Sequence, residues 1–444
     1  MEVLIENIIT YSTMLLLITG IVFYYIRKNQ RQSQSSREKV NRAKELGFYE
    51  PINLHPVVNL DVCIGSAACI KACPEKDILG LIDRKATTIN ASRCVGHGAC
   101  FHSCPVGAIS LVIGTEKRGV DLPHISPTFE TNIKGIYISG ELAGMGLIKN
   151  AVLQGREAVE YISKDLTKAE AEYDLLIIGA GPAGISATLK AKELGLKFIT
   201  VEQDSLGGTV YSFPRKKIIM TSNMYLPLYG KVNKKEFTKS ELLDMWNGVL
   251  KKNKISINEG EKVLSIEKGS EIFNTVTTKR TISSKTVLLA IGRRGSPRKL
   301  NIPGEGMEKV SYRLLEPELI TNQHVLVVGG GDSAIEAALA LTEGGNNILI
   351  SYRGDSFSRL KPKNFENIKK AAEDKLINII YKSNVVSISD KSVRIAFETD
   401  GINYEKEYPN DLVYIFAGGE LPNEFLEKVG IKITKKFGEA ILKH

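Results

Sequence analysis

Two glycine-rich turns, each between a short apolar run and a helical stretch, constrain the fold most strongly. The first turn is Gly179-Ala-Gly181-Pro-Ala-Gly184, which follows the apolar run at 174–178 and precedes ISATLKAKELG. The second turn spans 329–334, after HVLVV and before IEAALALTEGG. A buried strand, a tight turn and a helix in this order begin a parallel sheet covered by helices. We therefore expect an α/β chain with two such domains.

The first turn carries the pattern of a dinucleotide site. Its glycines let the backbone approach a pyrophosphate, and the amino terminus of the next helix stabilises the phosphate charge. The following apolar run, LKFITVE, ends in Glu202, 18 residues after Gly184. An acidic side chain at this place binds ribose hydroxyls. We predict a Rossmann-type site formed by Gly179, Gly181, Gly184 and Glu202.

The second turn predicts a second Rossmann-type site, which differs from the first in the group that it favours at the ribose. Its candidate residues are Gly329, Gly331, Asp332, Ser333 and Ala334. The next apolar run, NILIS, is followed by Arg353 and Arg359 and by no carboxylate at the ribose position. Because cations suit a 2′-phosphate, NADPH is favoured over NADH. The alternative is that both arginines are solvated loop charges.

All six cysteines lie within residues 63–104. They form two similar stretches, 31 residues apart: Cys63-IGSAA-Cys69-IKA-Cys73-Pro74 and Cys94-VGHGA-Cys100-FHS-Cys104-Pro105. A repeat of this kind indicates two related half-units. Clustered cysteines in a long chain indicate a metal or cofactor site, whereas secreted disulfide scaffolds spread cysteines through a short one. Zinc would need paired C-x2-C steps, which these stretches lack.

The spacing resembles that of bacterial two-cluster ferredoxins, whose pattern is C-x2-C-x2-C-x3-C-P. The resemblance implies an α+β iron–sulfur domain in which each cluster takes ligands from both stretches. It implies one set of Cys63, Cys69 and Cys104 with Ser66 nearby, and another of Cys94, Cys100 and Cys73 with His97 nearby. Ser66 and His97 replace the second cysteine of each stretch. Either these side chains ligate iron in a 4Fe-4S cluster, or a 3Fe-4S cluster lacks that corner.

Two dinucleotide folds, the first with an acidic end and the second with a basic end, resemble the thioredoxin-reductase-like flavoproteins. The resemblance implies FAD on the first fold, NADPH on the second, and a return towards the flavin at Gly292. Thioredoxin reductases carry a C-x-x-C before the second glycine loop, but residues 310–317 here contain no cysteine. A dithiol relay needs two thiolates. The chain is therefore not expected to reduce disulfides by that route.

In members of this family, the last segment of the chain contacts the flavin, and a similar pattern occurs here before the first glycine turn. The family pattern is similar to T-x3-G-hydrophobic-aromatic-x2-G-D, and residues 131–141 read TNIKGIYISGE, before a helical stretch. The resemblance implies a circular permutation that brings Gly140, Glu141 and Ala151 to the flavin. The alternative is a partial duplicate that folds against something else.

The amino-terminal segment predicts a membrane anchor. Residues 7–26 carry no charge, and seven Lys or Arg follow within 27–44. Twenty helical residues rise about 30 Å, the thickness of the hydrocarbon core, and the basic flank favours a cytoplasmic location for the rest of the chain. Topology thus accounts for much of the net charge of +9, without a nucleic-acid partner. A cleaved signal peptide is the alternative, but Glu2 and Glu6 precede the apolar run.

The expected organisation has seven parts. These are a transmembrane anchor (1–28), a basic tether (29–50), the iron–sulfur domain (51–115), the displaced flavin segment (116–165), the FAD domain (170–295), the NAD(P)H domain (296–410) and a return to the FAD domain (411–444). We expect a single-pass cell-membrane oxidoreductase that passes electrons between NADPH, FAD and the clusters, and a redox partner or small-molecule acceptor; a homodimer is compatible with it. The alternatives are a reductase of a quinone or small disulfide with accessory clusters, and a non-catalytic membrane redox sensor.

Overall fold

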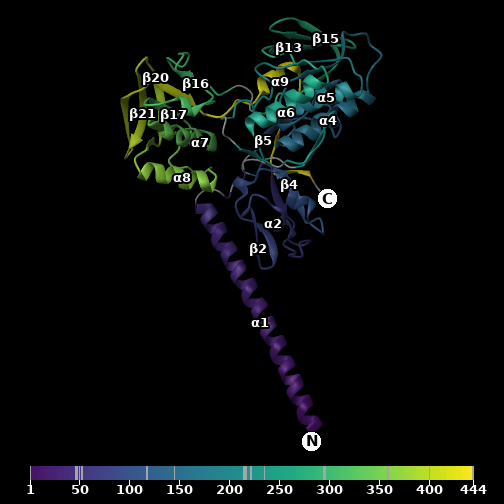
Figure 1. The fold of residues 1–444 in the computed structure, drawn as a ribbon, viewed down its shortest axis with the longest axis vertical. Coiled ribbons are helices and arrows are strands. Elements are labelled where there is room, and N and C mark those ends of the chain that lie inside the picture. The colour runs from purple at the N-terminus through teal and green to yellow at the C-terminus, as the bar shows by residue number, and fades with distance from the viewer. Residues whose placement is uncertain are drawn as a thin grey trace. The chain divides into compact units, whose positions relative to one another are not determined.

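The computed structural model divides the chain into two compact units, Met1–Val120 with Lys436–His444, and Asp121–Lys435. Figure 1 shows the course of the chain through both. The structure describes residues 2–45, 49, 51, 54–116, 119–144, 146–213, 218–220, 223–234, 236–293, 297–357, 360–399 and 401–442.

The first unit begins with one long helix, α1 (Glu2–Glu45). Its amino-terminal part is long and apolar enough to cross a membrane, by length and composition only, and a signal sequence would pass the same test. The sequence predicts a tether from residue 29, but the helix continues to Glu45. The reason is a helically spaced stripe of small or apolar residues that becomes half-buried or buried. It consists of Ser33, Ser36, Val40 and Ala43.

The stripe packs α1 against strand β2 (Leu79–Ile82) of the cysteine-rich domain. At Gly80 the approach is so close that an added Cβ would lie 2.8 Å from Ser36 Oγ. At the end of the hairpin, Asp83 accepts hydrogen bonds from Ser33 and Arg37. The basic segment is therefore a rigid, docked extension of α1.

The cysteine-rich domain repeats one loop-and-helix unit. Each cysteine stretch makes a loop and then a single helical turn, α2 (Ala68–Ala72) or α3 (Ala99–His102). Strands β1 (His55–Val58) and β4 (Ile109–Ile113) pair antiparallel, and β25 (Glu439–Leu442) joins β4. Strand β2 pairs with β3 (Lys85–Thr88). The repeat in the sequence is therefore a repeat in the fold.

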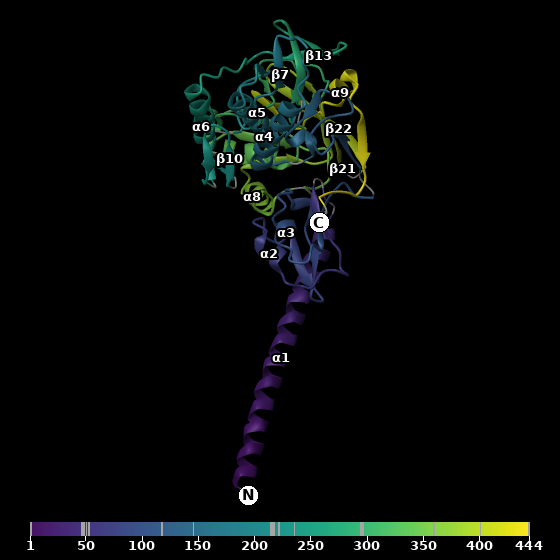
Figure 2. The same cartoon turned by 90° about the vertical axis from the view of Figure 1, so that its right-hand side faces the viewer.

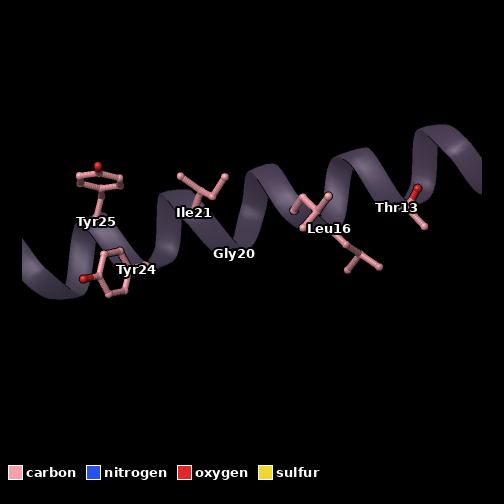
Figure 3. A pocket seen from close by; sticks show the side chains of 7 residues that line it. Thr13, Leu16, Gly20, Ile21, Tyr24 and Tyr25 are labelled. Atoms are coloured by element: carbon pink, nitrogen blue, oxygen red, sulfur yellow. The ribbon is translucent and has the colours of Figure 1, made fainter.

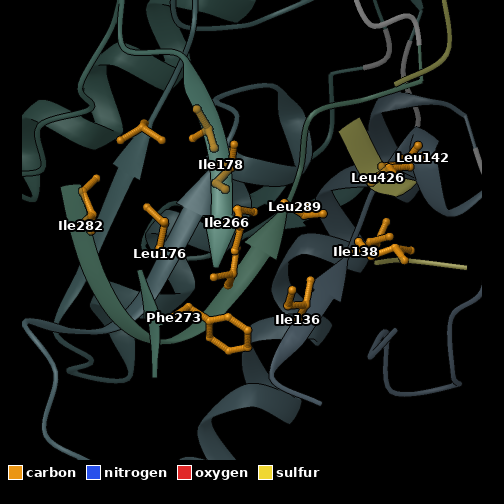
Figure 4. Packing of buried hydrophobic residues seen from close by; sticks show 14 of the residues in the cluster. Ile136, Ile138, Leu142, Leu176, Ile178, Ile266, Phe273, Ile282, Leu289 and Leu426 are labelled. Atoms are coloured by element: carbon orange, nitrogen blue, oxygen red, sulfur yellow. The ribbon is translucent and has the colours of Figure 1, made fainter. Parts of the chain in front are cut away.

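The second unit contains a six-stranded sheet that carries the first glycine turn. Its order is β13-β14-β15-β7-β8, with β6 beside β15. The strands are β6 (Ile136–Ile138), β7 (Tyr173–Ile178), β8 (Phe198–Val201), β13 (Val263–Lys268), β14 (Phe273–Thr277) and β15 (Thr281–Leu289). Strand β6 pairs parallel with β15, so the segment at 136–138 lies in the sheet of the first glycine turn. Its Ile136 and Ile138 pack in the apolar core with Leu289, as Figure 4 shows.

Helices α4 (Ile148–Lys164) and α5 (Pro182–Glu193) pack together beside this sheet, and both lie side by side in Figure 2. A further part follows β8 and surrounds the buried Trp246. It comprises β9 (Ile218–Met220), β10 (Met224–Leu226), β11 (Gly230–Val232), β12 (Glu236–Thr238) and α6 (Lys239–Lys252).

The second glycine turn belongs to a five-stranded parallel sheet of order β16-β23-β17-β18-β19. Its strands are β16 (Val310–Ser311), β17 (His324–Val328), β18 (Asn347–Ser351), β19 (Ile377–Ile380) and β23 (Leu412–Ile415). The helices α7 (Asp332–Leu341) and α8 (Pro362–Glu373) belong to the same domain, with a three-stranded sheet of β20 (Ser383–Ile388), β21 (Ser392–Thr399) and β22 (Ile402–Pro409). The remaining elements are β5 (Val120–Pro123), α9 (Asn423–Val429) and β24 (Ile433–Lys436). The expected α/β dinucleotide-binding fold is confirmed.

One buried charge offers a test of the first sheet. The Glu261 side chain is 1% exposed and accepts hydrogen bonds from Arg280 and Thr277. Burial acts to raise the pKa of Glu261, but these hydrogen bonds outweigh it and lower the pKa. A carboxylate with a lowered folded pKa stabilises the protein above its unfolded pKa, and this contribution is lost as pH falls through the folded pKa.

We therefore expect Arg280→Met to lower the melting temperature at pH 7 by about 2–4 °C, the shift that roughly 1 kcal/mol gives in a domain of this size. The difference from the unsubstituted protein should shrink as the pH falls below about 4, where carboxylates become protonated. Thermal melts across this range measure it. A loss of the same size at every pH would contradict the role of the ion pair.

Candidate cofactor sites

The three glycines of the first turn have different surroundings. An added Cβ would lie 2.5 Å from the Ala290 carbonyl oxygen at Gly179, and 1.8 Å from the Gly179 carbonyl oxygen at Gly184. At Gly181 it would meet nothing within 4 Å in the described structure. Two glycines are therefore required by packing, and the third borders open space where a pyrophosphate fits. Gly181 is also the N-cap of α5, whose first N–H groups suit an anion.

Glu202 lies at the end of β8, beside this turn. Its Oε2 accepts a hydrogen bond from the Ala180 N–H at 2.7 Å, and its Oε1 accepts one from the Asp204 N–H at 3.0 Å. Burial raises the pKa of Glu202, although these N–H groups act to lower it. The carboxylate thus fastens the turn, and each oxygen keeps a lone pair for a ribose hydroxyl.

The displaced segment reaches the same turn. The Gly140 N–H donates to the buried Gln154 Oε1 at 2.9 Å, and an added Cβ at Gly140 would lie 3.0 Å from Ala183. Half-buried Glu141 lies near Arg293, whose pKa is lowered by burial while Glu141 acts to raise it. The segment therefore packs against the residues of the first glycine turn.

Ala151, predicted at the flavin, is 8% exposed and clusters with Ala183 and Ala290. One turn later, an added Cβ at Gly155 would lie 2.1 Å from the Ala183 carbonyl oxygen. Sequence reasoning missed Gly155 and Gln154. Small residues at 151 and 155, four apart on one face of α4, were the signal for a close contact between α4 and α5.

The second turn repeats the same division of roles. An added Cβ at Gly329 would lie 2.5 Å from the Phe416 carbonyl oxygen and 3.3 Å from the Cβ of Ala334. At Gly331 it would meet nothing within 4 Å of the described atoms. The second cradle is therefore also open at its middle glycine, which suits a second pyrophosphate.

The other predicted residues of this site have varied surroundings. Asp332 Oδ1 accepts hydrogen bonds from the Lys361 N–H and the Asn364 side chain, which link α7 to α8. The exposed Ser333 lies in the first turn of α7, and the exposed Arg353 follows β18. Arg359 lies outside the described residues. Gly292, with φ of 67°, borders open space near the first site.

Tyr352 is an aromatic feature that sequence reasoning did not single out as functional. An added Cβ at Gly330 would lie 2.4 Å from its ring, and the ring stacks on Phe357 with centroids 5.3 Å apart. The ring therefore covers the second glycine turn, and its place directly after β18 was the available signal.

The first set of cysteines lines a cavity in the small domain. Cys63, Ser66, Cys69 and Cys104 line it, together with apolar side chains that include Ile64 and Val106. Burial, and then the thiols of Cys104 and Cys63, raise the pKa of Cys69. Ser66 is exposed, and its Oγ accepts a 3.4 Å hydrogen bond from the Ala68 N–H. These three thiols and the hydroxyl are those that the ferredoxin resemblance groups together.

The second set also forms a neighbourhood. Burial, and then the Cys73 thiol, raise the pKa of Cys94 to about 11, and burial with Cys94 and Cys73 raises that of Cys100 to about 12. The buried Nε2 of His97 has no hydrogen-bond partner in the described structure. Burial lowers the pKa of His97, against the opposing effect of Glu75. An orphaned ring nitrogen in this loop fits the fourth position of a cluster.

The thiol geometry suits clusters better than single ions. In the part of the chain that the structure describes, no three His, Cys, Asp or Glu side chains converge on a point that could hold one metal ion. A multi-iron cluster needs its thiolates spread around it, and bound iron offsets the burial that raises these pKa values. The two sets therefore fit iron–sulfur clusters, and the two cradles fit dinucleotides.

Fold and sites together define a flavin-dependent, pyridine-nucleotide oxidoreductase with an added iron–sulfur domain. The pyridine nucleotide-disulphide oxidoreductase family matches residues 176–443, more than half of the chain, so the chain belongs to this family. A 4Fe-4S dicluster domain matches residues 55–105. The predicted class, with FAD, NADPH and iron–sulfur clusters as its cofactors, is confirmed.

Several known proteins are similar to this chain. It is 28% identical over 265 residues to a ferredoxin–NADP reductase of Ignicoccus hospitalis, covering 59% of this chain and 83% of that protein. It is 28% identical over 273 residues to the bacilliredoxin reductase Bdr of Bacillus subtilis, covering 59% and 82%. The structure of the bacillithiol disulfide reductase Bdr of Staphylococcus aureus superposes with a TM-score of 0.52 at 26% identity, covering 61% and 86%.

Proposed function

We propose that this protein is a membrane-anchored oxidoreductase that passes electrons between NADPH, FAD, its iron–sulfur clusters and an external redox partner. When bound, these cofactors supply hydride transfer and single-electron transfer. The observation that carries the proposal is the union of two dinucleotide cradles and two cysteine sets in one chain, with no cysteine after Cys104. Disulfide exchange needs thiolates, and the cysteines of this chain are all in the two cluster sets. The clusters are therefore the route by which electrons leave the flavin. A ferredoxin-type partner fits, since one relative is a ferredoxin–NADP reductase.

In this proposal the first cradle holds FAD. Gly181 and the first turn of α5 receive the pyrophosphate, and Glu202 orients the ribose. The displaced segment, residues 116–165, supplies Gly140 and Glu141, in agreement with the pairing of β6 with β15. The start of α4 directs its positive end towards the flavin. In this proposal a circular permutation places this wall before the first glycine turn in the chain.

The cysteine sets hold the clusters. Cys63, Cys69 and Cys104 bind the first, with Ser66 at its corner, and the orphaned Nε2 of His97 joins Cys94, Cys100 and Cys73 at the second. A histidine ligand would raise the reduction potential of its cluster relative to four thiolates. The fourth ligand position of the first cluster, at Ser66, is more accessible to solvent than that at His97. Ser66 is exposed, and its hydroxyl already accepts a backbone hydrogen bond.

The anchor of the proposal is α1. Its apolar window is fully exposed, with Leu15, Leu16 and Leu17 each at least 65% exposed. Figure 3 shows the face on which Leu16, Ile21 and Tyr24 flank Gly20. The bilayer is the solvent in which such a surface is stable, and the basic residues after Ile26 favour the cytoplasmic side for the two units.

Spectroscopy under anaerobic conditions tests the electron route. The protein is purified without oxygen, its iron, sulfide and flavin are quantified, and EPR spectra are recorded before and after NADPH. We expect NADPH to bleach the flavin and to produce the signals of reduced clusters. Bleached flavin with clusters that do not respond would contradict the route.

The second cradle yields a separate prediction about nucleotide preference. We propose that the exposed Arg353, the second residue after β18, contacts the 2′-phosphate. Arg353→Ala should lower kcat/KM for NADPH about 10-fold and leave kcat/KM for NADH unchanged. A lost surface contact to a phosphate is worth roughly 1.4 kcal/mol. Lys391→Ala, at an exposed lysine, is a control of equal charge. Equal losses with both nucleotides would assign Arg353 another role.

A further inference from the structure

The two cysteine loops are related by the repeat, but their apolar residues are exposed to different extents. In the first loop Leu60 is 53% exposed and Ile64 is 65% exposed. Their counterparts 31 residues later, Ala91 and Val95, are buried and half-buried. An added Cβ at Gly96 would lie 3.0 Å from Leu54, so the chain before β1 covers the second loop. The first loop has kept an apolar surface that the second has covered.

This apolar surface borders the first cysteine set. We define the first-loop patch as Leu60, Val62, Ile64 and Val106, whose exposed fractions are 53, 42, 65 and 37%. Ile64 and Val106 also line the cavity of Cys63, Cys69 and Cys104. Contiguous exposed apolar side chains beside a redox site mark a contact surface. Asp61 is the acidic residue within the loop.

Contacts within the first unit place the patch near the end of the proposed membrane span. An added Cβ at Gly65 would lie 1.9 Å from the Arg84 carbonyl oxygen, and Lys85 Nζ donates to the Cys63 carbonyl oxygen. The loop therefore packs against the end of the β2–β3 hairpin. The same hairpin end binds α1, because the Asp83 carboxylate accepts a hydrogen bond from the Ser33 hydroxyl and the Asp83 N–H donates one to Ser33 Oγ.

The helical rise along α1 gives the height of the hairpin end above the hydrocarbon core of the membrane. The apolar run ends at Ile26, and Ser33 is seven residues further, which is a rise of roughly 10 Å. Each headgroup layer is about 5–8 Å thick, and spanning helices tilt by about 20°. The end of the hairpin thus lies at the outer edge of the headgroups. Exposed Arg84 beside the loop, and Arg27 and Arg31 on α1, suit anionic lipid.

We propose that the first-loop patch reaches into the lipid headgroup layer from its outer edge, so that the first cluster exchanges electrons at the membrane surface. This rests on the proposed anchoring by α1. Apolar side chains bind a membrane surface when they insert about 5–10 Å into it. Because α1 packs against the hairpin, it holds the first loop close to the headgroups. The second cysteine loop is instead covered by Leu54 at Gly96.

Tryptophan quenching by brominated lipid tests the depth of the loop. The full chain is placed in lipid nanodiscs containing anionic lipid, with or without bromine on the acyl chains near the headgroup. The chain has one tryptophan, the buried Trp246, which gives a constant background. Ile64→Trp and Leu60→Trp should each lose about half of their added fluorescence in brominated discs. Comparing the same variant in both lipids removes the constant quenching by a nearby cluster.

Lys76→Trp is the matched control. Exposed Lys76 precedes Asp77, which pairs with Lys39, six residues or roughly 9 Å further along α1 than Ser33. Its added fluorescence should not change between lipids. Iron content equal to that of the unsubstituted protein shows that each variant is folded.

The outcomes separate the two proposals. If the nanodiscs retain the protein but neither Ile64→Trp nor Leu60→Trp is quenched, the patch faces something other than lipid, such as a protein partner, and the inference is overturned. If the protein does not enter nanodiscs, the anchoring fails and the inference fails with it. Cluster reduction by NADPH, measured in the same preparation, reports on the electron route independently of both.

Discussion

Gly155→Ala is expected to weaken the binding of FAD to the protein. The new Cβ would lie 2.1, 2.9 and 3.1 Å from three backbone atoms of Ala183, none of which can rotate away. Helix α4 must then move off the first turn of α5, which forms the cradle with Gly181 and Gly184. Overpacking of this kind costs about 1–3 kcal/mol, against a gain of roughly 1 kcal/mol from removing a helical glycine. We expect at least a tenfold loss of FAD affinity, measured by flavin titration of the apoprotein.

The matched control is Gly248→Ala. Gly248 is also inside a helix, α6, but an added Cβ meets nothing within 4 Å in the described structure. This variant should keep its FAD and gain up to about 1 kcal/mol of stability. If Gly155→Ala binds FAD as tightly as Gly248→Ala, the packing of the displaced segment has no part in the flavin site.

The double variant Cys63→Ser, Cys94→Ser should separate flavin reduction from electron delivery. Each substitution removes one thiolate from one set, so both clusters lose a ligand that serine replaces poorly. Bleaching of the flavin by NADPH should keep its rate, because the cradles lie in the other unit. Electron delivery to a ferredoxin should fall by about two orders of magnitude, which corresponds to roughly 2.7 kcal/mol in the barrier. Stopped-flow absorbance measures both steps.

Ser66→Cys is the control that shows whether a substitution in the first cysteine loop by itself misfolds the domain. It restores the fourth cysteine of the first stretch, so the first cluster should have four-iron EPR signals while delivery continues. NADPH-dependent reduction of a quinone or small disulfide that survives in the double variant would favour a reductase with accessory clusters.

Much of the architecture is encoded in local patterns. The runs before Gly179 and Gly329 are short and apolar because parallel strands are covered on both faces, and the glycines mark where backbone must approach backbone. The stripe at Ser33, Ser36, Val40 and Ala43 also has regular helical spacing, but its polar composition favoured a tether over a packed helix. Serine packs there as a small residue because Gly80 lies opposite.

By itself, the sequence determined that this chain has two nucleotide cradles, two sets of three cysteines and no thiol for a disulfide relay, because residue types at short spacing specify these features. Only the tertiary structure decided that β6 joins β15, that Gly155 lies against Ala183, and that the Cys63 loop rests on the hairpin that binds α1. Each of these contacts joins residues far apart in the chain or on different elements. They depend on how whole surfaces pack, and a linear pattern does not carry that information.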